Sequence, residues 1–129
     1  MKAVTAPRFE RTPAASGPLV RGFSGKRFRI DGGTFDAVLL TPESGGAWDA
    51  PALDALTLAD FAPMLALDPP IEFLILGTGA TTRFAPRALV AALEEKGIGV
   101  EAMDSRAAAR TYGLLRGEGR WIAAALLPL

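Results

Sequence analysis

The residues best placed to do chemistry lie in the stretch FLILGTGATTRF, which spans residues 73–84. An apolar run that ends in Gly77 and Gly79 is how many nucleotide-binding loops begin, because glycine lets the backbone approach a phosphate closely. The dinucleotide-binding pattern needs a third glycine where this chain has Thr82. Glu101 lies at about the distance expected of the acidic residue that binds the ribose, so the match is partial.

The same loop also has features of a second kind of site, one that binds a small anion. Ala85 and Pro86 offer no side-chain oxygen to the first N–H groups of the helix predicted to follow, and free N–H groups at a helix start attract anions. We favour the alternative of a tight turn, in which a hydroxyl of Thr81 or Thr82 satisfies these N–H groups. The candidate niche consists of Gly77, Gly79, Thr81, Thr82, Arg83 and Arg87.

A polar cluster interrupts the otherwise apolar C-terminal half. Glu101 falls in a strand expected to be largely buried, and a buried carboxylate needs a cation, so we predict a structural ion pair with Arg120. The alternative is an active site in which Glu101 is a general base, Tyr112 a proton donor and Arg120 the group that binds an oxyanion. The members of the cluster are Glu101, Ser105, Thr111, Tyr112, Glu118 and Arg120.

The composition excludes several kinds of site. Because the chain has no Cys and no His, it has no disulfide, no thiol nucleophile, no Cys/His zinc site and no imidazole catalysis. Fourteen basic residues balance fourteen acidic ones, which argues against a nucleic-acid partner. We expect no metal and no cofactor, with a site made only of carboxylates left open as an alternative.

The lack of a recognisable targeting pattern leads us to expect a cytoplasmic protein. No stretch is long and apolar enough to insert into a membrane as a spanning helix. The first residues lack the continuous apolar segment of a secretory signal, and Pro7, Pro13 and Pro18 argue against an amphipathic presequence helix. We therefore expect a flexible N-terminal arm over residues 1–18 and one domain over residues 19–129.

The N-terminal part of this domain has the pattern of a β-hairpin. Phe28 and Ile30 alternate with arginines, glycines follow at positions 32 and 33, and TFDAVLL (residues 34–40) is predicted to continue as one strand. Residues 42–55 have the composition of a loop, with Trp48 as their one large apolar side chain. Thr57 and Asp60 are spaced to cap a short helix that ends before residue 68.

The C-terminal half alternates strands and helices. We predict strands over residues 71–76, 98–103 and 120–127, and helices over 86–96 and 104–115. This β-α-β-α-β order predicts a parallel core, with the hairpin either extending the sheet or forming another layer. Gly113 inside the second helix predicts either a close neighbour at its backbone or a local irregularity.

Four strings in this half resemble the Mth-type family of proteins of unknown function. They are LILGTG, VEAMDS, AAARTYGLL and EGRWIAAALLP, which begin at residues 74, 100, 107 and 118. The family includes the mitochondrial NADH dehydrogenase (complex I) assembly factor 3 and the adipogenesis-associated Mth-domain-containing protein. The resemblance implies a single compact three-layer α/β domain with a mixed sheet and no established enzymatic activity. Its motif residues are Gly77, Gly79, Glu101, Met103, Ser105, Thr111, Tyr112, Glu118 and Arg120.

The chain departs from this family at one position, because Gly113 stands where the family usually has an asparagine. We expect a non-catalytic interaction or assembly factor, and the resemblance implies a role in respiratory complex I biogenesis. Trp48 in its loop and the zero net charge suggest an apolar surface, which subunits or assembly factors of a respiratory complex, or a second copy of the chain, would cover. The alternative is a small-molecule (anion) binding protein or enzyme with a site over residues 77–83 and 101–120.

Overall fold

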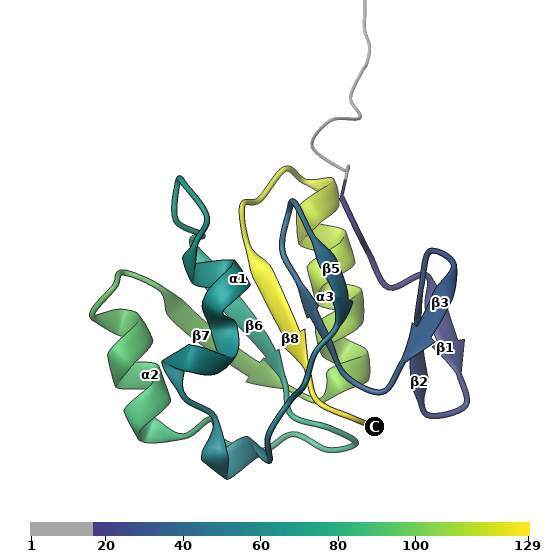
Figure 1. The fold of residues 1–129 in the computed structure, drawn as a ribbon, viewed down its shortest axis with the longest axis horizontal. Helices are drawn as coiled ribbons and strands as arrows, with labels where there is room; N and C mark the ends of the chain where they lie inside the picture. Colours follow the sequence, from purple (N-terminus) through teal and green to yellow (C-terminus); the bar gives the residue numbers. More distant parts are fainter. Residues whose placement is uncertain (1–16) are drawn as a thin grey trace, which may run out of the picture.

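The structure, a computed structural model, describes residues 17–129 of the chain and contains two β-sheets (Figure 1). The smaller sheet is antiparallel, and its strands in order are β1 (Gly22–Ser24), β2 (Arg27–Ile30) and β3 (Gly33–Phe35). The larger sheet has five strands in the order β5-β4-β8-β6-β7. These are β4 (Val38–Leu40), β5 (Gly45–Ala47), β6 (Phe73–Gly77), β7 (Gly99–Met103) and β8 (Ala123–Leu126).

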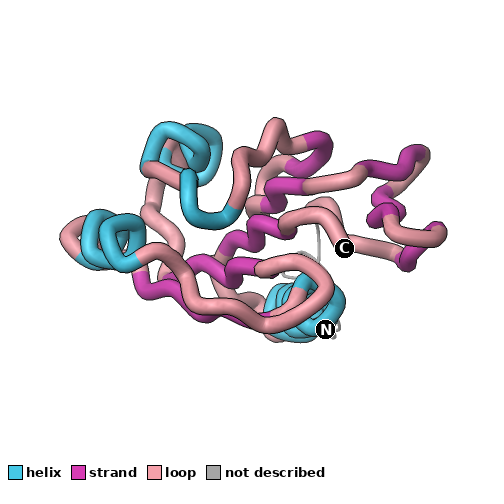
Figure 2. Tube along the Cα trace, turned by 90° about the horizontal axis from the view of Figure 1, so that it is seen from below, coloured by secondary structure: helices cyan, strands magenta, loops and turns pink. Residues whose placement is uncertain are grey.

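Helices lie on both sides of the five-stranded sheet (Figure 2). One side carries the short 3₁₀ helices η2 (Leu53–Ala55) and η3 (Leu58–Phe61) with α1 (Ala62–Leu65) and α2 (Arg87–Glu94). The other side carries α3 (Ser105–Gly117) together with the three-stranded sheet. The predicted three-layer α/β architecture with a mixed sheet is therefore confirmed.

The two sides of the sheet hold two separate core clusters. Leu74 and Leu76 of β6 pack with α1 and α2, whereas Ile75 between them packs with α3. The alanines of β8 alternate in the same way, and Ala123, Ala124 and Ala125 are all fully buried. Strands that are covered on both faces need apolar residues at every position, which is why these segments are continuous apolar runs.

The predicted parallel core is confirmed around β6. β6 pairs in parallel with β7 on one side and with β8 on the other, and β4 joins β8 in antiparallel orientation. The chain runs from β6 through α2 to β7, and then through α3 to β8 across the opposite face. The order of the strands therefore reverses between β6 and β8, and this is the position where open α/β sheets commonly bind ligands.

The helix ends follow local sequence signals. The Asp104 side chain accepts a hydrogen bond of 2.9 Å from the N–H of Ala107 and caps α3. The Asp60 carboxylate accepts a bond of 2.8 Å from the N–H of Thr57, as predicted for the start of η3. Pro86 stands immediately before α2. The helix predicted over residues 104–115 continues to Gly117.

Two predictions about the N-terminal half are wrong. Residues 34–40 do not form one strand, because the chain breaks at Asp36 and Ala37, so that β3 pairs with β2 while β4 joins the other sheet. Residues 42–55 are not only loop, since they contain β5, which pairs with β4. Local composition missed β5 because its two glycines have low strand propensity, and the strand forms through pairing with β4.

The boundary predicted at residue 19 stays a prediction. Residues 1–16 of the expected arm lie outside the described residues. Pro18 lies against the larger sheet, since a Cβ added to Gly45 would meet the Pro18 ring at 2.7 Å.

Gly113 has neither of the two predicted causes. It lies inside the continuous helix α3, and a Cβ placed there would have no neighbouring atom within 4 Å. The glycine therefore lowers the stability of the helix without a compensating contact among the described residues.

We expect Gly113→Ala to raise the free energy of unfolding by about 0.5–1 kcal/mol, because alanine has the higher helix propensity and meets no obstacle. Urea denaturation of the two proteins measures this difference. Gly77→Ala is the matched control, since a Cβ at Gly77 would lie 2.9 Å from the Ser105 Cα and should destabilise the fold. A loss of stability in Gly113→Ala would contradict the prediction.

Candidate functional site: the loop after strand β6

The first functional candidate is the glycine loop, which is joined to the start of α3 by one buried hydroxyl. The Ser105 Oγ accepts a hydrogen bond of 2.9 Å from the N–H of Gly79 and donates one of 2.8 Å to the carbonyl of Leu127. The N–H of Ser105 donates to the carbonyl of Gly79 at 2.8 Å. Ser105 is fully buried, so this hydroxyl connects the ends of β6 and β8 with the first turn of α3.

Gly77 and Gly79 serve this close approach. A Cβ on Gly77 would lie 2.7 Å from the Ser105 Oγ and 2.9 Å from both the Ser105 Cα and the Leu126 Cδ2. Gly79 has a φ of 107°, a value that favours glycine. The two glycines therefore allow a helix to pack against the end of a strand and let the chain turn away from it.

This packing argues against a nucleotide-binding loop. In such a loop the backbone N–H groups point toward a phosphate, but here the N–H of Gly79 is bound by Ser105 and the N–H of Thr78 by the carbonyl of Met103 at 2.8 Å. The N–H of Leu127 donates to the carbonyl of Gly77 at 2.9 Å. The position between β6 and β8, where the strand order reverses, is thus closed by the protein itself on the α3 side.

Thr78 organises the rest of the loop, and the sequence analysis missed it. Its hydroxyl donates to the carbonyl of Thr81 at 2.7 Å and accepts from the N–H of Arg83 at 3.0 Å. Thr81 and Thr82 are exposed, and α2 begins without a side-chain cap, so the hydroxyl bond expected from Thr81 or Thr82 is wrong. The signal that was overlooked is a threonine placed directly between the two glycines at the strand end.

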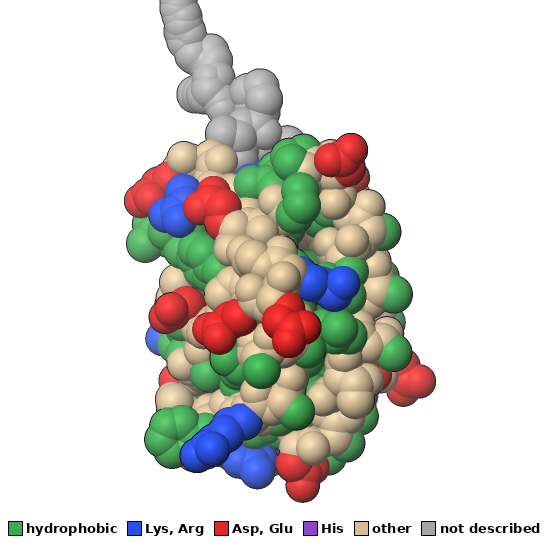
Figure 3. All heavy atoms as spheres, turned by 90° about the vertical axis from the view of Figure 1, so that its left-hand side faces the viewer, with side chains coloured by type: hydrophobic (Ala, Val, Ile, Leu, Met, Phe, Trp, Pro, Cys, Tyr) green, Lys and Arg blue, Asp and Glu red, His purple; other side chains and the backbone are tan. Residues whose placement is uncertain are grey.

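The outer part of the loop presents the other residues of the candidate niche to solvent. Arg83 and Arg87 are both exposed there, and the anion niche stays a prediction. Between them stands Phe84, whose side chain is 97% exposed. Figure 3 shows the side of the molecule that carries α2. Apolar and basic side chains lie next to one another at the lower end of this side, and Figure 1 places the loop at the same end.

The second polar cluster is dispersed in the structure, and the predicted ion pair is wrong. Arg120 binds Glu72, with 2.7 Å between the Arg120 Nη2 and the Glu72 Oε1. Glu101 is exposed, because β7 is an edge strand that is covered less completely than β6 or β8. The hydrogen bond from the Arg120 guanidinium holds the pKa of Glu72 below its usual value.

The remaining members of the cluster occupy separate environments. Tyr112 is a residue of α3 that is buried in the core between this helix and the sheet, and this burial raises the pKa of its hydroxyl, with the positive charge of Arg116 opposing the rise. Thr111 is half-buried, and Glu118 is exposed where α3 ends. The structure therefore does not bring Glu101, Tyr112 and Arg120 together as a base, a donor and an oxyanion-binding group.

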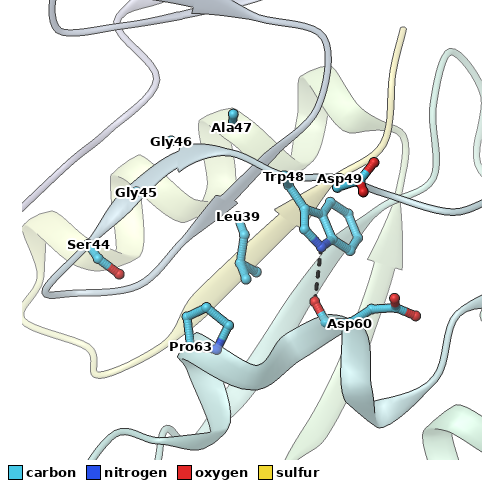
Figure 4. A pocket seen from close by; sticks show the side chains of 9 residues that line it. All are labelled: Leu39, Ser44, Gly45, Gly46, Ala47, Trp48, Asp49, Asp60 and Pro63. Carbon is cyan, nitrogen blue, oxygen red and sulfur yellow. Dashed lines mark hydrogen bonds between the residues drawn. The ribbon is translucent and has the colours of Figure 1, made fainter.

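Trp48 does not provide the exposed apolar surface that we expected of it. Its indole N–H donates to the carbonyl of Asp60 at 2.9 Å (Figure 4). The centre of its ring lies 5.6 Å from that of Phe61. The side chain therefore connects the end of β5 to η3 beside a hollow of about 270 Å³. This hollow contains none of the predicted site residues.

A separate hollow of about 320 Å³ does include a predicted residue. It lies between residues 50–53 and the ends of β6 and β8, and Thr78, Arg83 and Pro128 contribute to its lining. Arg83 is its one cationic side chain. Within residues 17–129 no group of three or more acidic side chains could hold a metal ion, and no helix is long and apolar enough to cross a membrane.

The buried hydroxyl gives a first prediction for this site. We expect Ser105→Ala to lower the free energy of unfolding by about 1–3 kcal/mol, because it leaves the N–H of Gly79 and the carbonyl of Leu127 without their partner. Thr82→Ala is the matched control, since that hydroxyl is exposed. Equal denaturation midpoints for the two variants would refute the structural role of Ser105.

The ion pair between Glu72 and Arg120 gives a second prediction. The folded pKa of Glu72 is lowered, so its pairing with Arg120 stabilises the fold above the ordinary glutamate pKa and is lost as the pH falls through the folded pKa. We expect Glu72→Gln to lower the melting temperature slightly at neutral pH and to match the wild type in acid, whereas Glu101→Gln should have no effect at either pH. Thermal melts across this range test both statements, and a clear loss for Glu101→Gln at neutral pH would contradict them.

Known proteins with similar sequences and folds support this description. The NADH dehydrogenase (ubiquinone) 1 alpha subcomplex assembly factor 3 of Danio rerio is 32% identical over 116 residues, which cover 89% of this chain and 67% of that protein. An uncharacterised protein of Rhodobacter capsulatus is 33% identical over 121 residues, which cover 92% of each. The solution structure of a Bordetella pertussis protein described as a Mth938-like domain is 28% identical, covers 99% of this chain and 92% of that one, and has a TM-score of 0.73.

The similarity to the assembly factors covers only part of those proteins, since this chain spans 67% of the Danio rerio protein and 60% of its Bos taurus counterpart. A family model described as "Protein of unknown function (DUF498/DUF598)" matches residues 20–127. The predicted resemblance to the Mth-type proteins is confirmed, and the chain belongs to the DUF498/DUF598 family of proteins of unknown function.

Proposed function

We propose that this protein is a non-catalytic interaction or assembly factor that binds a protein partner through the loop between β6 and α2. The observation that carries the proposal is Phe84, which is 97% exposed. Leaving a phenylalanine side chain in water forgoes about 1.5–3 kcal/mol that burial would provide. A partner that covers the ring would recover much of this free energy.

The exposure of Phe84 results from a well-bonded loop. Thr78 binds the carbonyl of Thr81 and the N–H of Arg83, which holds the segment immediately before the phenylalanine. A preformed loop loses less conformational entropy on binding than one that must first become ordered. Arg83 precedes the phenylalanine and Arg87 follows it three residues later, and both are exposed. Arginine and aromatic residues are enriched at the centres of protein interfaces.

The named relatives suggest which process the interaction serves. Their names describe assembly factors of an NADH dehydrogenase, so we propose a role in the biogenesis of respiratory complex I, with subunits or other assembly factors as partners. The cytoplasmic location expected from the sequence belongs to this proposal. The alternative is that a second copy of the chain binds the loop. Size-exclusion chromatography distinguishes this self-association from binding of a different protein.

One observation favours a second function, the binding of a small anion. The hollow that contains Thr78 and Arg83 opens at the end of the sheet where the strand order reverses, and it carries a cationic side chain. The closed glycine loop weakens this alternative, because the N–H of Gly79 is no longer available to a ligand. Arg83→Gln in a thermal-shift measurement with inorganic phosphate tests it directly.

We expect Phe84→Ser to keep the stability of the wild type and to lose the protein partner. The tagged full chain should retain that partner in affinity purification from its native cell, with identification by mass spectrometry. The matched control is Leu114→Ser, since Leu114 is 67% exposed but lies on α3 away from the loop.

Replacement of the chromosomal gene by the same two variants extends this test to the process. Assembled complex I and NADH oxidation in membranes should fall with Phe84→Ser and stay normal with Leu114→Ser. Undiminished complex I after deletion of the gene, together with equal partner retention by both variants, would refute the proposed function.

A further inference from the structure

The outer edge of β7 carries backbone groups that have no hydrogen-bond partner among residues 17–129. The carbonyl of Met103 accepts the N–H of Thr78 at 2.8 Å and therefore faces β6. Because the backbone groups of successive residues in a strand point to opposite sides, those of Glu101 also face β6, whereas those of Val100 and Ala102 point outward. β7 is the last strand of the five-stranded sheet, and no described residue forms a hydrogen bond with these outward groups.

This edge lies beside the exposed phenylalanine. Ala102 of β7 lines a hollow of about 200 Å³ together with Thr82, Arg83 and Phe84. The side chain of Val100 packs with the core on the α2 side, so that of Ala102, two residues on, lies on the same face of the strand. The Glu101 side chain points to the opposite face, where it is exposed.

We propose that β7 accepts an extended segment of a partner protein as a sixth strand of the sheet. This inference rests on the proposed interaction function and identifies the site and the chemistry of the partner. The outward groups of Val100 and Ala102 would form the hydrogen bonds, as in other cases where a peptide adds to a sheet edge. Phe84 and Ala102 would contact an apolar side chain of the added strand.

The charge of Glu101 selects the residue opposite it. In an antiparallel addition, the partner residue facing Glu101 occupies a non-hydrogen-bonded pair, in which the two side chains come closest. Glu101 has no ion-pair partner among residues 17–129, so its carboxylate is available to a Lys or Arg of the added strand. The segment that fits this edge therefore alternates apolar and basic residues.

The same carboxylate disfavours a second copy of the chain. If two copies of β7 paired in antiparallel orientation through all their outward groups, Val100 of each would face Ala102 of the other. Glu101 would then face Glu101 in the closest type of pair, and like charges placed directly opposite one another destabilise a sheet. A charged residue at the centre of an edge strand is a common protection against such self-pairing.

The other edge of the sheet fits a partner strand less well. β5 has three residues, Gly45, Gly46 and Ala47, and offers neither a large apolar side chain nor a charged one for recognition. Pro18 lies over Gly45 and covers part of that strand. The recognition chemistry is therefore concentrated at β7.

A peptide selection with the full chain tests the proposal. Panning a displayed library of short random peptides against the immobilised protein should enrich sequences that alternate apolar with Lys or Arg residues. Synthetic peptides of these sequences should slow hydrogen exchange at the amides of Val100 and Ala102, which we expect to exchange rapidly in the unbound protein. Glu101→Lys and Phe84→Ser should each weaken binding by about tenfold.

The control for charge reversal is Glu94→Lys, because Glu94 is exposed on α2 and should leave the affinity unchanged. Failure to enrich any peptide, enrichment of acidic peptides, or equal binding by Glu101→Lys would overturn the inference. If Phe84→Ser abolishes capture of the native partner while that partner leaves exchange at Val100 and Ala102 unchanged, the interaction function stands and strand addition fails. The amide exchange thus separates the two proposals.

Discussion

The architecture depends on the contact between the start of α3 and the ends of β6 and β8. One hydroxyl, that of Ser105, joins the N–H of Gly79 to the carbonyl of Leu127, and the contact is possible only because Gly77 lacks a side chain. It places α3 across one face of the sheet and leaves the other face to α1 and α2. A larger residue at Gly77 would separate the helix from the strands and expose the core between them.

This contact has a consequence for function, because it occupies the position where related sheet topologies bind ligands. An N–H group that already has a buried partner cannot stabilise a phosphate without breaking that bond, which has a considerable free-energy cost. The polar groups at the strand ends are therefore used for structure. What the loop offers to other molecules lies on its outer side, where an aromatic ring and two guanidinium groups face solvent.

The placement of charge follows from the position of each strand in the sheet. A carboxylate in a central strand would need a buried cation, but the same residue type on an edge strand remains hydrated at little cost. Glu101 lies on the edge, and Glu72 lies near the beginning of β6, where Arg120 reaches it from the segment that precedes β8. Among residues 17–129 no carboxylate is therefore buried in the core, and the buried charge there is the guanidinium of Arg116 on α3.

The sequence by itself determined the strands and helices of the C-terminal half, the cap formed by Thr57 and Asp60, and the family, because these depend on apolar periodicity and on motifs within short segments. Only the tertiary structure decided which strands are central and which lie at the edge, and therefore that Glu101 is exposed. It also decided the partner of Arg120 and the pairing of β5, since these depend on contacts between residues far apart in the chain. The role of Ser105 belongs to the same class: a serine at a helix start is common, and only the packing of α3 against Gly77 shows that its hydroxyl is buried. The exposure of Phe84 likewise follows from the path that Thr78 imposes on the loop, because composition gives every phenylalanine the same tendency to be buried.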